Sequence, residues 1–189
     1  MRYDGVVKSK ISAQQIILII VAVLISTAVA NYDKLLPHRW QTYTSPDGNF
    51  SVELPGKPGV ESAQAPVEGG GMLPITIIST QPNAATAYMC SYVENENLAS
   101  KSADDILNAA RDGGLAKIQG TVKSEKRLTI QDYPALTVQA NARGNSLADI
   151  QIVVAGKRLY MLMVVNTVAQ DREEKSVERM FRSFKVLKP

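Results

Sequence analysis

Residues 40–58 read W-Q-T-Y-T-S-P-D-G-N-F-S-V-E-L-P-G-K-P, and the rest of the chain is interpreted from this stretch. Its segment 45–48, S-P-D-G, favours a tight turn because proline fixes φ at the second turn position and glycine is common at the fourth. After the turn, Phe50, Val52 and Leu54 alternate with polar residues, which is the pattern of a strand with one buried face. The stretch therefore predicts two short strands joined by this turn.

The length and charge of the chain limit the possible functions. It has 189 residues and a formal net charge of +3. Residues 1–30 contain three basic side chains and one acidic side chain, so residues 31–189 carry a net charge of only +1. Nucleic-acid-binding domains usually carry a strongly basic stripe, so we expect no nucleic-acid partner. We divide the chain into a targeting segment (1–30), a connector (31–39) and a single domain (40–189).

An apolar run dominates the amino terminus. Residues 16–30, I-I-L-I-I-V-A-V-L-I-S-T-A-V-A, carry no charge and follow a basic opening. The run ends in A-V-A, which fits a signal peptide cleaved after Ala30. Counted over residues 11–30, the run has about 20 residues, enough for an uncleaved transmembrane helix with the downstream domain outside the cytoplasm. Both alternatives predict an extracytoplasmic location, either anchored in the cell membrane or exported to a compartment such as the periplasm.

Residues with the chemistry for catalysis or metal binding are scarce. Cys90 is the only cysteine and lies in an apolar, strand-like segment, so we expect a buried, unreactive thiol. His38 is the only histidine, and a metal or acid–base site would need partners for it. Asp104 and Asp105 fall in the first turn of a predicted helix, where the helix dipole alone favours acids. The sequence therefore predicts no catalytic, cofactor-binding or metal-binding residue, and no cofactor.

Residues 59–74 are predicted to form a flexible surface loop. They contain two prolines and the triple glycine at 69–71. A phosphate-binding loop would need a lysine and a hydroxyl residue at a following helix start, and both are missing. Because long irregular segments often carry function, a binding role is expected here first.

The remaining segments predict an α+β fold with an antiparallel β-sheet flanked by helices. Strands are expected at 75–80, 87–94, 121–130, 135–143, 147–155 and 158–166. The last four are joined by short turns, which favours an antiparallel meander. Residues 159–165 are apolar on both faces, as expected for a central strand that other elements cover on both sides.

Two helices complete the predicted domain. Ser102 begins a helix as a capping residue. Gly113 with Gly114 is expected to weaken or end it, with a further turn through Leu115 and Ile118 as the alternative. Residues 171–185 form a second amphipathic helix, which is expected to dock on the sheet. Because the strands are joined by hairpin-length connections, we expect α+β packing rather than a parallel α/β sheet.

The order of elements resembles the PsbP-like domains. The resemblance is carried by the 40–58 stretch, by Y-P-A at residues 133–135 and by F-x-S-F-K at residues 181–185, and it extends over nearly all of residues 40–187. It implies an antiparallel sheet between helices, used in that superfamily mostly for docking onto other proteins, as in the extrinsic subunits of photosystem II and a Ran-binding import factor. No binding residue of that superfamily has a match that can be carried over.

The sequence predicts a non-enzymatic, membrane-associated extracytoplasmic domain that docks onto an unknown protein partner or an envelope complex. The alternative is a small-molecule binding domain, with its ligand between the sheet and the 59–74 loop and with Tyr88, Tyr92 or Tyr160 lining the pocket. A third possibility is a hydrolase, which would need a serine or a pair of carboxylates brought together from distant strands.

Overall fold

The computed structural model describes residues 39–66 and 72–187. His38 and the predicted hydrophobic segment at residues 11–30 lie outside this part of the chain. Among the residues that are described, no helix has the length and apolar character needed to cross a membrane.

The predicted amino-terminal hairpin is present. Strands β1 (Trp40–Ser45) and β2 (Phe50–Pro55) pair antiparallel, and the turn is held by the Ser45 hydroxyl, which accepts the N–H of Gly48 at 2.9 Å. The three apolar side chains of β2 are fully buried. The last strand, β10 (Lys185–Val186), pairs with the other edge of β2 and completes a three-stranded sheet.

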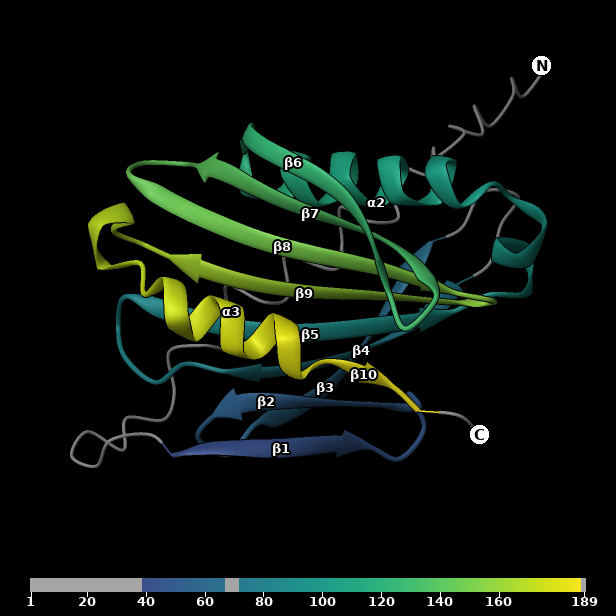
Figure 1. Ribbon diagram of the computed structural model, residues 1–189, viewed down its shortest axis with the longest axis horizontal. Helices are drawn as coiled ribbons and strands as arrows, with labels where there is room; N and C mark the ends of the chain where they lie inside the picture. Colours follow the sequence, from purple (N-terminus) through teal and green to yellow (C-terminus); the bar gives the residue numbers. More distant parts are fainter. Residues whose placement is uncertain (1–38, 67–71, 188–189) are drawn as a thin grey trace, which may run out of the picture.

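The larger sheet has seven antiparallel strands in the order β3-β4-β5-β9-β8-β7-β6 (Figure 1). Their bounds are β3 (Gly59–Pro66), β4 (Met72–Thr80), β5 (Thr86–Glu94), β6 (Thr121–Ile130), β7 (Tyr133–Ala142), β8 (Ser146–Ala155) and β9 (Arg158–Asn166). The last four strands form the predicted meander. β9 also pairs with β5, which places it in the middle of the sheet.

The prediction of a flexible loop at residues 59–74 is wrong. β3 pairs with β4 along its whole length, from Gly59 opposite Ser79 to Pro66 opposite Met72. The β-branched residues of β4 favour strand structure, and β3, with small and polar residues, extends the ladder as an edge strand. The triple glycine at 69–71 lies outside the described residues.

Both predicted helices are present with different limits. α2 (Ala103–Ile118) begins as expected, since the Ser102 hydroxyl accepts the N–H of Asp105 at 3.1 Å. It runs through Gly113 and Gly114 without a break, because Leu115 and Ile118 beyond them are buried against the sheet. A short 3-10 helix, η1 (Glu96–Ser100), precedes α2.

The carboxyl-terminal helix is shorter than predicted. α3 (Glu174–Ser183) follows a separate 3-10 turn, η2 (Ala169–Asp171), so residues 171–173 are not part of it. Val177 and Met180 are its buried residues. It packs beside β2, on the side of the large sheet that carries the small sheet.

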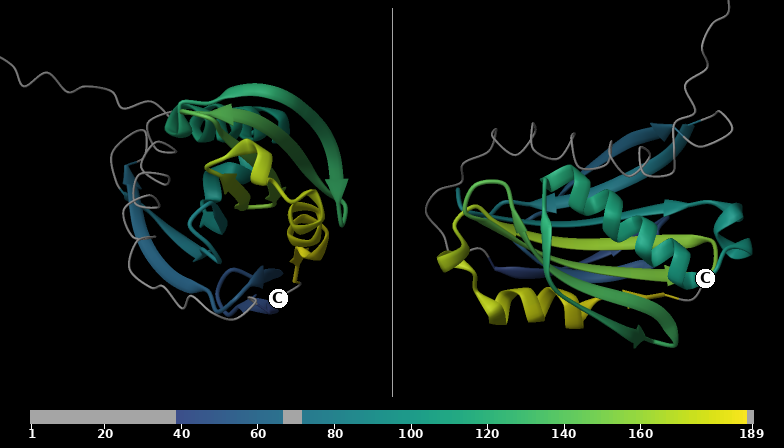
Figure 2. Two further views of the ribbon diagram at one scale, coloured as in Figure 1. Left: turned by 90° about the vertical axis from the view of Figure 1, so that its left-hand side faces the viewer. Right: turned by 90° about the horizontal axis from the view of Figure 1, so that it is seen from above.

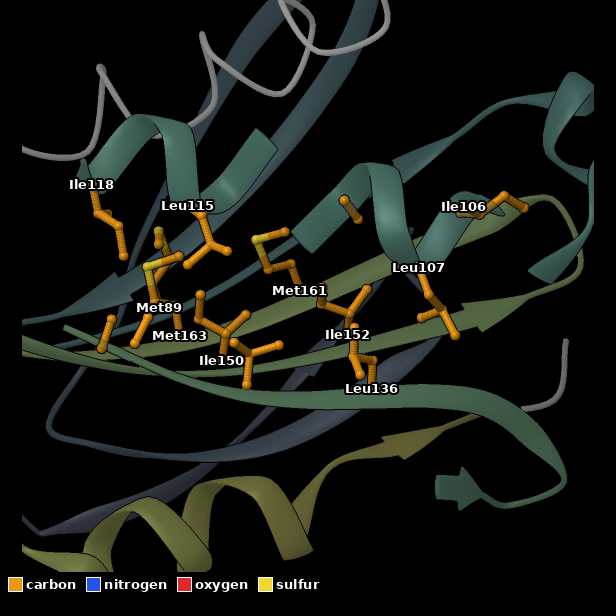
Figure 3. Close-up of a cluster of buried hydrophobic side chains, with 14 of the residues drawn as sticks. Met89, Ile106, Leu107, Leu115, Ile118, Leu136, Ile150, Ile152, Met161 and Met163 are labelled. Carbon is orange, nitrogen blue, oxygen red and sulfur yellow. The ribbon is translucent and has the colours of Figure 1, made fainter. Parts of the chain in front are cut away.

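The two faces of the large sheet hold different cores. Under α2 the side chains are aliphatic or methionine, and Figure 3 shows the helix residues pointing at those of the strands. The opposite face, under the small sheet and α3, contains most of the aromatic residues. β9 contributes to both, with Met161 and Met163 on the α2 side and Tyr160, Leu162 and Val164 on the other. The prediction of a central strand covered on both faces is confirmed.

Candidate functional site

A cleft of about 840 Å³ lies at the end of the molecule where β5 begins and β9 ends. The strands and helices that line it meet at the left-hand side of Figure 1, which faces the viewer in the left view of Figure 2. The lining residues come from both sheets, the β4–β5 loop, η2 and α3. The cleft therefore opens where the small sheet and α3 meet the end of the large sheet.

The floor of the cleft is formed by two buried polar residues on neighbouring strands. Thr86 on β5 and Asn166 on β9 are direct partners in the ladder, and the Thr86 hydroxyl donates to Asn166 Oδ1 at 3.2 Å. Asn166 is 1% exposed, and its Nδ2 has no hydrogen-bond partner among the described residues. Buried polar atoms in proteins are nearly always paired. The amide nitrogen of Asn166 is therefore an unpaired, buried donor on a residue that lines the cleft.

The β4–β5 loop forms one wall and is held in place by its own hydrogen bonds. Asn83 Oδ1 accepts the N–H groups of Ala85 and Thr86 at 2.8 Å and 2.7 Å. The Ala85 carbonyl accepts the N–H of Thr167 at 2.8 Å, which ties the loop to the end of β9. This wall is thus fixed by backbone contacts before any ligand arrives.

Two aromatic side chains form a second wall. Trp40 and Tyr88 meet edge to face, with ring centroids 5.6 Å apart. The Arg179 guanidinium carbon lies 4.7 Å from the centre of the Trp40 ring, and Arg179 Nε donates to Glu53 at 2.6 Å. Burial raises the pKa of Tyr88, and a hydrogen bond with Ser176 partly offsets this, so the phenol is neutral at pH 7.

The rim of the cleft is acidic. Asp171 and Glu173 both line it, and within the described residues no basic side chain pairs with either. Arg172 lies between them in the sequence, but its guanidinium is engaged by Asp149 through two hydrogen bonds of 2.8 Å and 3.0 Å. Glu173 Oε2 accepts the Ser176 hydroxyl at 2.8 Å. Because the Arg172 guanidinium is paired with Asp149, it does not pair with the two rim carboxylates.

The tyrosines considered from the sequence have different environments. Tyr88 lines the cleft, whereas Tyr92 and Tyr160 pack in the aromatic core. The cleft lies beside the β4–β5 loop, at the opposite end of β4 from the segment that joins β3 to β4. It is therefore not at the place between the sheet and residues 59–74 that the sequence suggested.

The other candidate residues have structural surroundings. Cys90 is fully buried, and burial raises the pKa of its thiol, as expected for an unreactive cysteine. Asp104 pairs with Arg127 at 2.9 Å at the surface. Within residues 39–66 and 72–187 no cluster of metal-ligating side chains occurs.

Apart from Tyr88, the residues that make the cleft were missed by the sequence analysis, although two signals were present. Asn166 follows the apolar run of residues 159–165 in β9, and Trp40 is the only tryptophan of the chain. Residues 171–173 were assigned to a helix, which hid the fact that they form a connection at the cleft rim.

The chain has an α+β fold with antiparallel sheets and two α-helices in its described residues, similar to that of PsbP. No family model matches the chain, and no curated protein matches its sequence. Among solved structures, it is similar to cyanobacterial PsbP (CyanoP) from Synechocystis, with a TM-score of 0.53 and 10% identity over 84% of this chain and 98% of that chain. A Pseudomonas aeruginosa protein of unknown function aligns with a TM-score of 0.45 and 10% identity over 80% of this chain and 99% of that one. At such identities the likeness concerns the fold alone.

Proposed function

We propose that this chain is a non-enzymatic docking domain that holds a segment of a partner protein in the cleft. The observation that carries the proposal is the free amide donor of Asn166 at the floor of the cleft. An extended peptide has a carbonyl group at every residue and can supply the missing acceptor. The fixed β4–β5 wall reduces the conformational entropy lost on binding.

The proposal includes the location predicted from the sequence. The domain would act outside the cytoplasm, either anchored through residues 11–30 or released by cleavage after Ala30. The resemblance to PsbP-like domains, which mostly dock onto other proteins, supports the same class of function. The partner would then be a protein of the cell envelope or a membrane complex.

Site-specific photocross-linking in the producing cells tests the docking function. A benzoylphenylalanine residue is placed at Ala84, an exposed alanine of the cleft wall, and in a matched control at Ala116, an exposed alanine of α2. The proposal expects one cross-linked polypeptide from position 84, mapped to one short segment, and no such product from position 116. Identical products from both positions, or none from either, would contradict it.

A second candidate function is small-molecule binding in the same cleft. Its volume lies within the range of roughly 300–1,000 Å³ that is common for ligand pockets. Thr86, Ser176 and Asn166 line the cleft together with the rings of Trp40 and Tyr88, and ligand pockets commonly combine a few polar groups with an aromatic lining. Native mass spectrometry of the full chain would show a bound compound of constant mass that is lost when Asn166 is replaced by leucine.

Hydrolase chemistry finds less support in the cleft. Ser176 and Glu173 are hydrogen bonded, but they are neighbours at the start of α3 rather than a pair from distant strands. A serine nucleophile needs a base that accepts its proton and a third group that orients the base. The described residues of the cleft supply a carboxylate next to the serine but no third group that orients it.

A further inference from the structure

We propose that the cleft recognises an arginine or lysine side chain on an extended segment of the partner. This inference rests on the docking function proposed above and names the chemistry of the segment. It combines three features of the cleft: the acidic rim, the aromatic wall and the free donor of Asn166.

The acidic rim selects a cation. Asp171 and Glu173 are exposed at the cleft and have no basic partner among the residues described. The basic side chain nearest to them in the sequence, Arg172, is turned to the buried Asp149, which also accepts a hydrogen bond from Gln139 at 3.0 Å. A cationic group on a bound segment would therefore meet two carboxylates that no basic side chain of the described residues pairs with.

The aromatic wall suits the stem of a long basic side chain. Lysine and arginine carry apolar methylene groups that lie along apolar surfaces while their charged ends remain at a polar rim. Trp40 and Tyr88 supply such a surface in the cleft whose rim carries Glu173. The Arg179 guanidinium already lies over Trp40, which shows that this ring accepts a cation.

The amide donor of Asn166 favours a peptide over a free amine as the ligand of the cleft. A basic side chain alone would satisfy the rim and the aromatic wall, but it has no acceptor for the amide N–H at the floor. A backbone carbonyl of the same segment supplies that acceptor. The buried amide donor pairs with a hydrogen-bond acceptor, and the exposed carboxylates pair with a cation. A basic peptide carries both groups.

The only tryptophan lies in the cleft, so its fluorescence reports binding directly. The full chain is titrated with the capped peptide Ala-Ala-Arg-Ala-Ala, and with versions that carry citrulline or glutamate in place of arginine. We expect saturable changes with the arginine peptide and a roughly tenfold weaker affinity for the citrulline peptide, because a hydrogen-bonded charge is lost. The glutamate peptide is expected not to bind.

Variants of the chain assign the effect to the rim. Glu173→Gln is expected to weaken binding of the arginine peptide by roughly three- to fivefold. Glu174→Gln, which removes the same charge from the next residue outside the cleft lining, is expected to weaken it by less than about twofold. Asn166→Leu is expected to lower the affinity for every peptide that binds, whether or not the peptide carries arginine. Circular dichroism confirms that each variant is folded.

The outcomes separate this inference from the docking function. If the arginine, citrulline and glutamate peptides bind equally, or if Glu173→Gln and Glu174→Gln behave alike, the preference for a basic side chain is overturned while docking stands. The same conclusion follows if the segment cross-linked from position 84 contains no arginine or lysine. If no peptide changes the fluorescence and position 84 captures no segment, both proposals fail.

Discussion

The face of the large sheet under α2 and the opposite face are both buried, but they are covered in different ways. One continuous helix of 16 residues closes the first face over aliphatic side chains. The second face is covered by separate pieces, the small sheet and α3, over a cluster of aromatic rings. The cleft opens at the end of the second face, where these pieces meet. A cover made of several elements leaves a seam at which a binding site can form.

The largest expected effect comes from the centre of the aromatic face. Phe50 is fully buried and contacts the rings of Tyr43, Tyr92, Tyr160 and Phe184, with centroids 5.6–6.1 Å apart. Phe50→Ala should lower the free energy of unfolding by about 3–5 kcal/mol, because it removes these contacts and leaves a cavity. Urea denaturation measures the change, with Phe50→Leu as a milder variant if the alanine variant does not fold. A loss below about 1 kcal/mol would show that this face is loosely packed.

A comparable change under α2 should affect stability without affecting the cleft. Leu107 is 1% exposed and belongs to the aliphatic core. Leu107→Ala should cost about 2–4 kcal/mol of unfolding free energy. The fluorescence of Trp40 in the folded variant, and its response to peptide, should match those of the unchanged protein. A shifted emission in the native state would mean that the two faces are coupled.

Removing the Tyr160 hydroxyl should have a smaller effect on the free energy of unfolding, and this effect depends on pH. It donates to the Gly48 carbonyl at 2.8 Å, so Tyr160→Phe should cost about 1 kcal/mol. Burial raises the pKa of Tyr160, so the unfolded chain loses this proton first as the pH rises above about 10. The stabilisation is thus complete below pH 10 and is lost as the pH rises through the folded pKa. When the pH is raised from 8 to above 10, the urea midpoint should fall less for the phenylalanine variant than for the unchanged protein.

The smallest effect is expected at the β6–β7 turn, where the large sheet reaches the small one. Gln131 and Asp132 both have positive φ, at 48° and 71°, and Gln131 Oε1 accepts the N–H of Val186 at 2.7 Å. Asp132→Gly should stabilise the protein by about 0.5 kcal/mol, because glycine adopts this conformation without strain. Asp112→Gly, within α2, should instead destabilise it by about 0.5 kcal/mol, because glycine has a lower helix propensity and the contact with Arg111 is lost. Thermal unfolding measures both, and the same sign for the two would contradict the backbone argument.

Local sequence signals predicted most of the elements. The S-P-D-G turn, the Ser102 cap and the short connections of the meander each act over a few residues, and all are present. β3 was missed because its residues, G-V-E-S-A-Q-A-P, have weak strand preference and its order depends on pairing with β4. The pairing of β5 with β9 joins residues far apart in sequence, and no local pattern specifies it.

The cleft was harder to predict than the fold for the same reason. Trp40, Tyr88 and Asn166 lie in three separate strands and Glu173 in the connection before α3. Only long-range contacts bring them together. The sequence marked Tyr88 as a pocket residue but gave it partners, Tyr92 and Tyr160, that belong to the core. A site built from contacts across distant strands leaves no spacing pattern that can be read along the chain.

The small sheet joins the two ends of the described chain, since β2 lies between β1 and the final strand β10. During synthesis, the free edge of β2 has no partner until residues 185 and 186 have left the ribosome. The aromatic core beneath it can close only after residues 40–186 have all been made. A chain that lacks these last residues would leave one edge of β2, and the aromatic side chains beside it, without their cover.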